Sequence, residues 1–393
     1  MMEKVENYIT GYIKGKTPKM LFDKEENGCL PYLSPDYLRN ISQPESYAQP
    51  DSKLVVVNEG EVIVLWDGSN AGEILISKKG ILASTMTLLE FDENEIDKNY
   101  FGYSFQQLEY ILKAKTAGSG IPHADKGVIN KLNFYKPSLP EQASIANILS
   151  KVDEAIESVK KSIEAAEKLK KSLMQNLLTG RMKPDGTLRT EEEFYEDEKF
   201  GKVPKGWEVK KVKNCFKFKN GKGNTTSNLK EIPDDEYCVP VYGGNGITGY
   251  YHSALLNKPT IIIGRVGEYC GNVFKTPEKS WVTDNAMLVS EVLMQDYNID
   301  FFTIKLNSLN FKQYSDSTGQ PKITQGSIGG IFITYPVKIE EQNKIIYLIN
   351  NISNNIQQKQ TQITTLERLK KSLMQNLLTG KVRVGEEGKN EKE

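Results

Sequence analysis

Cysteine and histidine are scarce in this sequence. The 393 residues include four cysteines and two histidines. The cysteines stand singly along the chain, with no CxxC pair, at Cys29, Cys215, Cys238 and Cys270. A disulfide framework or a structural zinc site needs several such residues at close spacing. We therefore expect neither, and no metal site.

Long apolar runs are also absent, and so is the apolar core of a secretory signal near the first residue. This excludes a membrane span and predicts a cytoplasmic protein. The formal net charge is zero, which argues neither for nor against a nucleic-acid partner. Lysines nevertheless crowd residues 202–222. That stretch could line a phosphate backbone, or be the solvated face of a strand beside a linker.

Catalytic motifs are missing as well. The chain has no P-loop, no NPPY-like methyltransferase loop and no HExxH. Residues 244–249 match GxGxxG, but no helix pattern follows them, so we interpret them as a glycine-rich turn. Pro184-Asp185 and Asp197-Glu198-Lys199 have nuclease-like spacing, but they lie in a polar segment without an expected strand. We expect no catalytic residue.

What the sequence does contain is a long repeat. Residues 169–180 read LKKSLMQNLLTG, and residues 369–380 read the same. A twelve-residue identity after two hundred residues indicates two copies of one unit, each ending in this segment. The function must therefore suit an object with pseudo-twofold symmetry.

Each copy of the repeat predicts one long helix with a coiled-coil stripe, and a phase slip where the stripe reaches Leu169 and Leu369. The seam residues are Ile145, Leu149, Val152, Ile156, Ile163, Leu169, Leu173 and Leu177, then Ile345, Ile349, Ile352, Ile356, Ile363, Leu369, Leu373 and Leu377. We expect the two helices to pack on each other; the alternative is that each packs only on its own domain. Gly180 and Gly380 suit the left-handed position after a helix end.

Between the helices, short β-branched runs alternate with turn residues, as in Val62 to Leu65 before Asp67-Gly68-Ser69. One helix is expected from Ser104 to Lys115. The fold class is α+β. We predict a first domain at 1–139, a helix at 140–181, a surface linker at 182–202, a second domain at 203–338, a second helix at 339–381 and a disordered tail at 382–393.

Both domains carry loops rich in glycine and in side chains that can donate to DNA bases and phosphates. The candidate contacts are Lys16, Trp66, Asp67, Ser69, His123, Lys222, Asn224, Tyr242, Asn245, Arg265, Gln320 and Lys322. Taken alone, each is an ordinary loop residue. The prediction of DNA contacts rests on their recurrence in two related domains.

At this point the chain resembles the specificity subunit of Type I restriction-modification systems. The resemblance rests on the Glu-Gln pairs at 141 and 341, the twin LKKSLMQNLLTG segments, Pro204 to Glu208, and Thr283-Asp284-Asn285-Ala286. It implies two target recognition domains, each reading one half of a split double-stranded DNA site. It implies an antiparallel helix pair that sets the gap and docks two methyltransferase subunits. Restriction and translocase subunits would join them, and this chain would hold no catalytic residue, cofactor or metal.

One departure concerns the start. The second unit has a Pro-Lys-Gly-Trp-Glu segment before Val212, whereas the first begins almost at Val5. This predicts that the first domain lacks its opening edge strand. Two other readings remain: a stand-alone nuclease or methyltransferase, disfavoured by the missing motifs, and a DNA-binding or protein-interaction scaffold unconnected with restriction.

Overall fold

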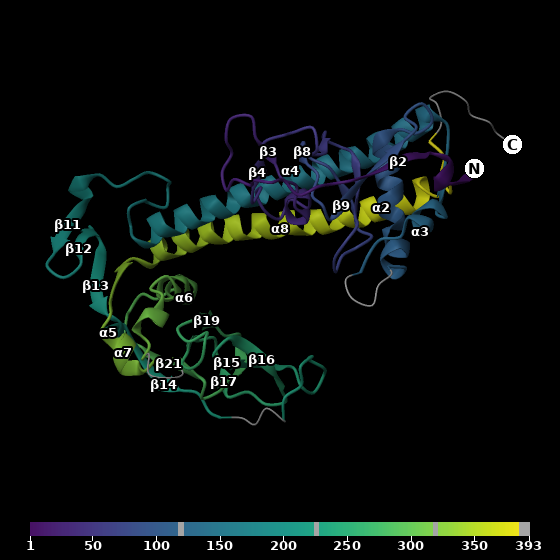
Figure 1. The fold of residues 1–393 in the computed structure, drawn as a ribbon. Helices are drawn as coiled ribbons and strands as arrows, with labels where there is room; N and C mark the ends of the chain where they lie inside the picture. The colour runs from purple at the N-terminus through teal and green to yellow at the C-terminus, as the bar shows by residue number, and fades with distance from the viewer. Residues whose placement is uncertain (117–121, 224–227, 317–320, 385–393) are drawn as a thin grey trace. The chain divides into compact units, whose positions relative to one another are not determined.

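The structure is a computed structural model that describes residues 1–116, 122–223, 228–316 and 321–384. It divides into two compact units (Figure 1). Unit 1 comprises Met1–Lys161 and Lys359–Glu393, and unit 2 comprises Ser162–Gln358. Each unit therefore contains one variable domain and one part of each long helix.

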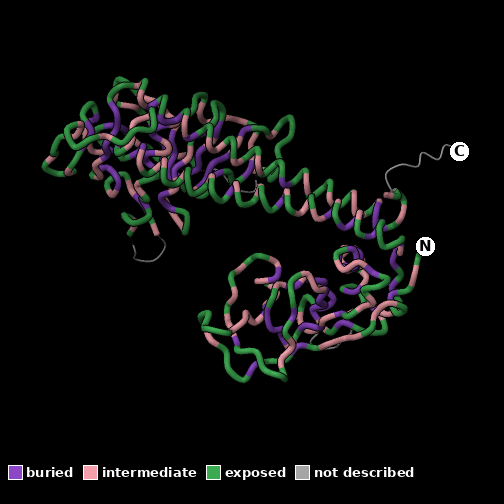
Figure 2. Tube along the Cα trace, turned by 90° about the horizontal axis from the view of Figure 1, so that it is seen from above, coloured by how far each residue is buried: buried purple, intermediate pink, exposed green. Residues whose placement is uncertain are grey.

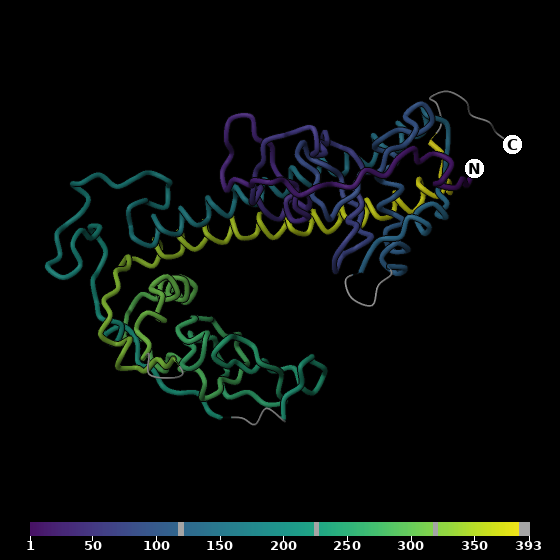
Figure 3. The backbone as a smooth tube through the Cα atoms, in the orientation of Figure 1, coloured from purple at the N-terminus to yellow at the C-terminus, as the bar shows by residue number. Residues whose placement is uncertain are grey.

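The long helices are α4 (Leu139–Leu178) and α8 (Ile339–Leu377). In unit 1 the first part of α4 lies beside the last part of α8, antiparallel to it (Figure 3). In unit 2 the last part of α4 lies near the first part of α8. Both helices end before a glycine with positive φ, +72° at Gly180 and +71° at Gly380. The predicted α+β fold with two long antiparallel helices is confirmed.

The predicted phase slip is wrong. Leu169 and Leu369 are 53% and 46% exposed, whereas Lys170 and Lys370 are half-buried on the seam. The alternation of three- and four-residue steps continues without a break from Ile163, and it selects position 170. A lysine fits there because its stem covers apolar surface while its ammonium reaches a polar partner. The other predicted seam residues are buried or half-buried: Ile145, Leu149, Val152, Ile156, Ile163, Leu173, Leu177, Ile345, Ile349, Ile352, Ile356, Ile363, Leu373 and Leu377.

A polar network fixes the helix pairing in unit 1. The Lys370 ammonium lies 2.7 Å from one carboxylate oxygen of Asp153, and the Tyr103 hydroxyl donates to the other at 2.8 Å. In unit 2 the equivalents of Asp153 and Tyr103 are Ser353 and Ile304. Among the described residues, no acid pairs with Lys170 there. The seam in unit 1 therefore contains an ion pair that the seam in unit 2 lacks.

The two domains share one sheet order. Unit 1 has β2-β9-β6-β7 and unit 2 has β14-β21-β18-β19. The strands are β2 (Ile9–Lys14), β6 (Val62–Leu65), β7 (Ile74–Ile76), β9 (Met86–Phe91), β14 (Phe216–Asn220), β18 (Ile261–Gly264), β19 (Val273–Lys275) and β21 (Ala286–Val292). The helix α2 (Lys98–Ala114) packs on β6 and β7 in unit 1, and α6 (Ile299–Asn307) packs on β19 in unit 2. The internal repeat thus extends through the variable domains.

Smaller elements complete each domain. Unit 1 has β1 (Met2–Lys4), η1 (Val5–Asn7), β5 (Val56–Val57), β8 (Gly80–Ile81), α3 (Lys126–Asn130) and β10 (Asn133–Tyr135). Unit 2 has β13 (Trp207–Lys211), α5 (Val212–Cys215), β17 (Leu256–Asn257), β20 (Lys279–Val282), η4 (Phe311–Tyr314), α7 (Gln325–Gly329) and β22 (Phe332–Pro336). The pairs β1–β10 and β13–β22 correspond, as do β5–β8 and β17–β20.

The two domains differ in the segment that follows β2 or β14. Unit 1 inserts β3 (Leu30–Pro31), α1 (Pro35–Leu38) and β4 (Tyr47–Ala48). Unit 2 inserts a hairpin of β15 (Val239–Gly243) and β16 (Gly246–Tyr251). Its tip at Gly244-Asn245 is the turn that the sequence predicted, with no helix after it. One scaffold therefore carries two different insertions.

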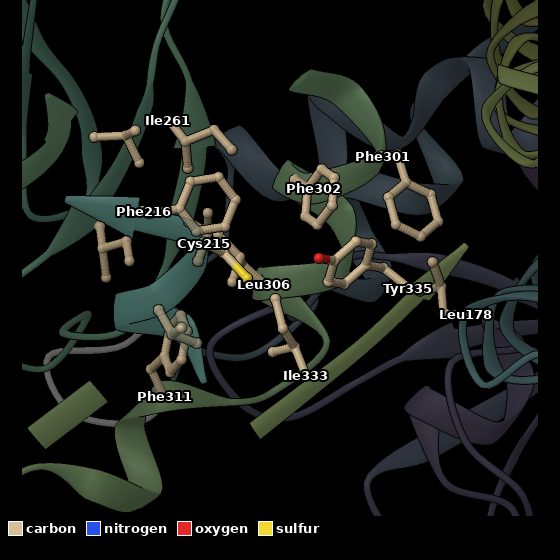
Figure 4. Close-up of a cluster of buried hydrophobic side chains, with 14 of the residues drawn as sticks. Leu178, Cys215, Phe216, Ile261, Phe301, Phe302, Leu306, Phe311, Ile333 and Tyr335 are labelled. Atoms are coloured by element: carbon tan, nitrogen blue, oxygen red, sulfur yellow. The ribbon is translucent and has the colours of Figure 1, made fainter. Parts of the chain in front are cut away.

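Each domain shares its core with the long helices. In unit 1, Phe101 and Phe134 pack in one cluster with Ile145 and Leu377. In unit 2, Phe301, Phe302 and Tyr335 pack with Leu178 from the last turn of α4 (Figure 4). Figure 2 shows buried residues where each domain meets the helices. A domain and its helix segments therefore form one folding unit.

The Glu-Gln pair at the start of each long helix joins helix to domain. The Gln142 amide donates to the Glu95 and Pro137 carbonyls and accepts from the Asp97 N–H. Gln342 bonds in the same way to Asp296, Pro336 and Asn298. Both glutamines are fully buried.

The neighbouring glutamate binds an arginine that follows the other helix. Arg383 forms a bidentate pair with Glu141, at 2.8 Å and 2.7 Å, and its hydrogen bonds lower the pKa of Glu141. Arg189 donates to Glu341 at 2.6 Å and to the Gly180 carbonyl at 2.7 Å. In each unit the start of one long helix is thereby tied to the end of the other.

Four further expectations are corrected. β1 pairs with β10, so the first domain has an opening edge strand after all. The helix expected from Ser104 begins at Lys98, because the Asp97 side chain caps it. The expected linker holds η2 (Glu191–Glu193) and a hairpin of β11 (Phe194–Asp197) and β12 (Gly201–Pro204).

The fourth correction concerns the tail. Two contacts hold residues 382–384: Arg383 pairs with Glu141, and the partly buried Val384 packs against the core of unit 1. The rest of the expected tail lies outside the described residues. No helix in the described parts of the chain combines the length and apolar content that a bilayer crossing requires.

Replacing Asp153 should weaken the fold of unit 1. Asp153→Ala leaves the half-buried Lys370 and Tyr103 without their acceptor, and we expect a loss of about 1–3 kcal/mol of unfolding free energy. Ser353→Asp should add up to about 1 kcal/mol by giving Lys170 a partner. Chemical denaturation measures both, with Glu157→Ala, at an exposed 3.9 Å pair, as the neutral control. Equal losses of unfolding free energy in Asp153→Ala and Glu157→Ala would show that the Asp153 network does not stabilise unit 1.

Candidate nucleic-acid interface

The end of β2 in unit 1 crosses another backbone segment very closely. A Cβ on Gly15 would lie 2.1 Å from the Ala83 carbonyl oxygen, so only glycine fits there. The next residue, Lys16, donates its N–H to Leu82 at 3.2 Å and has an exposed side chain. The crossing sets the position of Lys16 over the loop after β8.

The same crossing occurs in unit 2. A Cβ on Gly221 would lie 2.1 Å from the Thr283 carbonyl oxygen, and Lys222 donates its N–H to Val282 at 2.9 Å. Lys16 and Lys222, which sequence reasoning selected separately, therefore occupy equivalent positions. The Trp281 indole donates to the Lys222 carbonyl at 2.9 Å, which supports that loop further.

A second loop reaches the same surface of unit 1. Trp66 donates its N–H to Thr85 and accepts from Ala124, and Asp67 forms a β-bridge with His123. The Trp66 ring is half-buried against Tyr12, with ring centroids 6.1 Å apart. Ser69 is exposed in the same loop. The backbone thus joins the β6–β7 loop to the segment before α3.

Side chains reinforce this junction. The carboxylate of Asp67 is 2.6 Å from His123 Nδ1 and 3.0 Å from the Lys14 ammonium. Burial raises the pKa of Asp67, but the hydrogen bonds from His123 and Lys14 outweigh it and leave the pKa below its usual value. Both carboxylate oxygens are occupied, so Asp67 serves to position its neighbours.

Unit 2 repeats the junction with different side chains. Arg265 donates its N–H to Asn285 and accepts from Ile323, and Val266 forms a β-bridge with Lys322. Arg265 therefore stands where Trp66 stands, and Lys322 where His123 stands. The Arg265 guanidinium donates to the Asp284 carbonyl at 2.9 Å, while its Nε is buried without a partner among the described residues.

The β15–β16 hairpin joins this surface. A Cβ on Gly244 would be 3.1 Å from the Val266 carbonyl oxygen, so the tip with Asn245 rests on the Arg265 loop. Tyr242 was expected to contact DNA, but its side chain is buried and packs with Ile262, Val282 and Leu288. Asn224 and Gln320 lie outside the described residues.

Two parts of the sequence interpretation need revision. Three lysines of the lysine-rich stretch are neutralised: Lys202 pairs with Glu191, Lys210 with Glu208, and Lys217 with Glu291. Lys14 was missed, because strand alternation alone does not indicate that its ammonium meets Asp67. Within the described parts of the chain, no group of His, Cys, Asp and Glu side chains could hold a metal ion.

Comparison with known proteins decides the family. The model of the Type I restriction modification DNA specificity domain matches residues 9–168 and 204–368. The chain belongs to this family of Type I specificity subunits. A Type I restriction enzyme specificity subunit of Methanocaldococcus jannaschii is 32% identical, over 95% of this chain and 91% of the relative. One from Escherichia coli is 27% identical over the same shares.

Solved structures agree on the fold. The S subunit of a Type I system from M. genitalium has a TM-score of 0.61 at 19% identity, covering 96% of both chains. An S subunit from Thermoanaerobacter tengcongensis has a TM-score of 0.50 at 14% identity, covering 97% of both chains. The shared fold thus covers both units and both long helices.

The glycine crossings provide a test of how the loops are held. Gly221→Ala, and likewise Gly15→Ala, should force the facing carbonyl away at a cost of about 1–3 kcal/mol. Faster amide hydrogen exchange at 282–284 or 82–84 should accompany the loss. Gly330→Ala is the matched control, because no atom of the residues that the structure describes lies within 4 Å of its added Cβ. If all three variants unfold at the same denaturant concentration, the crossings do not hold the loops.

Proposed function

We propose that this specificity subunit reads a bipartite site in double-stranded DNA, with one recognition surface in each unit. Unit 1 contributes Lys16, Trp66, Ser69 and His123, and unit 2 contributes Lys222, Asn245, Arg265 and Lys322. Asp67 positions His123. The chain acts without catalytic residues of its own, and methylation and cleavage belong to its partners.

One observation carries this proposal: equivalent positions in the two units hold different DNA-reading chemistry. Lys16 corresponds to Lys222, Trp66 to Arg265, and His123 to Lys322. Lysine at the first pair suits phosphate in both units. Tryptophan and arginine at the second pair offer an apolar ring in one unit and a bidentate donor in the other. Such a difference on one scaffold suits two unlike half-sites.

The different insertions support the same conclusion. Thr283 in unit 2 donates its N–H to Tyr242 of the β15–β16 hairpin, and Leu33 in unit 1 donates to Ile81. Each insertion therefore borders the loop that its own glycine crossing fixes. A change of insertion alters the recognition surface and leaves the four-stranded sheet as it is. This arrangement suits a protein whose task is to discriminate sequences.

The repeated segment supports docking of two copies of one partner. Seam residues must be alike for packing. Exposed residues are not constrained in this way, and elsewhere on the helices most of them differ, as Lys151 and Glu154 differ from Asn351 and Asn354. In 169–180 and 369–380 the exposed residues are identical: Leu169, Lys171, Ser172 and Gln175, and Leu369, Lys371, Ser372 and Gln375. We infer that each stretch binds one methyltransferase subunit, with restriction subunits joining that core.

An acidic side chain on this surface should block docking. Leu169→Glu and Leu369→Glu each bury a charge against the partner, and we expect at least tenfold weaker binding of one methyltransferase copy, on the order of 2 kcal/mol. Native mass spectrometry should report one bound copy instead of two. Tyr347→Glu is the control, because Tyr347 is 67% exposed on α8 and its counterpart on α4 is a different residue, Asn147. Two bound copies in both leucine variants would remove this surface from the proposal.

Mapping of methylated DNA tests the function as a whole. Cells carrying this chain with its methyltransferase should show adenine methylation at one bipartite sequence with a fixed gap. Duplicating 152–158 together with 352–358 adds one heptad to each helix and keeps the seam in phase. The helices grow by about 10 Å, which corresponds to about three base pairs of DNA.

We therefore expect the heptad variant to methylate the same two half-sites with a gap about three base pairs longer. The half-sites should not change, because no recognition loop is altered. Methylation by the parent complex at a continuous sequence, without two separated half-sites, would refute the proposal that the chain recognises a bipartite site. An active variant that keeps the parent gap would show that helix length does not set the spacing.

A further inference from the structure

His123 and Lys322 occupy equivalent places in two otherwise different surfaces. Each forms the outer residue of an antiparallel β-bridge, with Asp67 in unit 1 and with Val266 in unit 2. The preceding proline accepts from a glycine N–H in both, Gly68 to Pro122 and Gly267 to Pro321. The backbone therefore presents the two side chains alike. In one unit that side chain is permanently cationic, and in the other it can lose its charge.

The surroundings of His123 fix which ring nitrogen carries a proton. Nδ1 lies 2.6 Å from a carboxylate oxygen of Asp67, and Lys14 holds the other oxygen. Because Asp67 is ionised at neutral pH, Nδ1 keeps its hydrogen and donates it. In the neutral ring Nε2 is then an acceptor, and only in the imidazolium does it become a donor. The side chain is 52% exposed, so a ligand can reach the ring.

The remaining charged groups near His123 are already occupied. The Asp125 carboxylate caps α3 by accepting from Gly127 and Val128. The Lys126 ammonium lies 4.6 Å from the centre of the Tyr12 ring. Lys14 offsets the charge of Asp67, so the cluster carries a net positive charge only when His123 is protonated.

We propose that His123 contacts DNA as an imidazolium, with Nε2–H donating to an anionic or strongly accepting atom, in the role that Lys322 has in unit 2. The inference rests on the proposed function and goes beyond it, because it makes reading by unit 1 depend on uptake of a proton. A phosphate oxygen and the O6 or N7 acceptors of guanine share this chemistry. A neutral His123 would turn a lone pair toward the same acceptor and repel it.

The experiment measures DNA affinity against pH for the assembled methyltransferase on its mapped site, at constant ionic strength. We expect affinity to fall on the order of tenfold between pH 6 and pH 8, as one charge-assisted hydrogen bond is lost. His123→Lys should bind equally well across this range, and His123→Gln should bind equally weakly. The chain has only two histidines, so His252→Gln is the control and should keep the full dependence. Comparing variants with the same partner subunits cancels the histidines of those subunits.

A reciprocal variant in unit 2 tests the same role even if the His123 variants misfold. Lys322→His leaves unit 1 untouched and should steepen the pH dependence by giving unit 2 a titrating contact. The ring C–H resonances of the two histidines provide a direct measure, and that of His123 should titrate at higher pH when DNA is bound. Binding to different DNA sequences distinguishes a phosphate acceptor from a guanine acceptor. Loss of a phosphate contact in His123→Gln weakens all DNA alike with a shallower salt slope, whereas loss of a guanine contact weakens only the parent half-site.

Two results would overturn the assignment: a pH dependence that His123→Gln leaves unchanged, or a His123 titration that does not move on DNA binding. A complex that binds its mapped site no better than scrambled DNA refutes the proposed function itself. A complex that discriminates normally but shows no proton linkage refutes only the role of His123.

Discussion

The fold depends on a buried glutamine at the first turn of each long helix. Gln142 and Gln342 each satisfy three backbone groups of the adjoining domain from inside the core. An unsatisfied buried amide costs about 1–3 kcal/mol per group, so this geometry tolerates little movement. The joint fixes how α2 or α6 approaches its long helix. Without it, neither domain would have a defined position on the apolar stripe that completes its core.

The glutamate beside each glutamine ties the start of its helix to the end of the other, with different partners in the two units. Glu141 takes a bidentate arginine from the segment after α8, and Glu341 takes Arg189 together with the Trp207 indole. The glycine that ends the opposite helix is covered by Tyr135 in unit 1 and by Trp207 in unit 2. The partners come from different places in the sequence, but the charge balance and ring contact are the same. Such a joint lets the rest of each domain diverge.

The sequence predicted the parts of this fold that depend on repetition and local pattern. The helices, the glycine ends and the strand Val62–Leu65 needed only spacing and turn chemistry. Lys170 was missed although the three- and four-residue steps select it, because a charged residue was not counted as part of the apolar stripe. The other failures involve long-range contacts. The strands β11 and β12 pair across a polar stretch that shows no apolar alternation. Tyr242 was misplaced because its burial depends on Ile262 and Leu288, which sequence spacing does not connect. The equivalence of His123 and Lys322 required the two β-bridges.

The zero net charge reflects equal numbers of basic and acidic residues, 51 of each. Scaffold lysines such as Lys217 and Lys275 lie against acids on neighbouring elements, so they add little to the attraction of phosphates. The exposed Lys16 and Lys222 at the recognition loops remain available to phosphates. Non-specific attraction grows with every neutralised phosphate, and a chain without net positive charge gains less from random DNA. Two weak surfaces linked in one chain can still bind tightly, because the second contact forms at high effective concentration. Selectivity then rests on whether both half-sites fit at once.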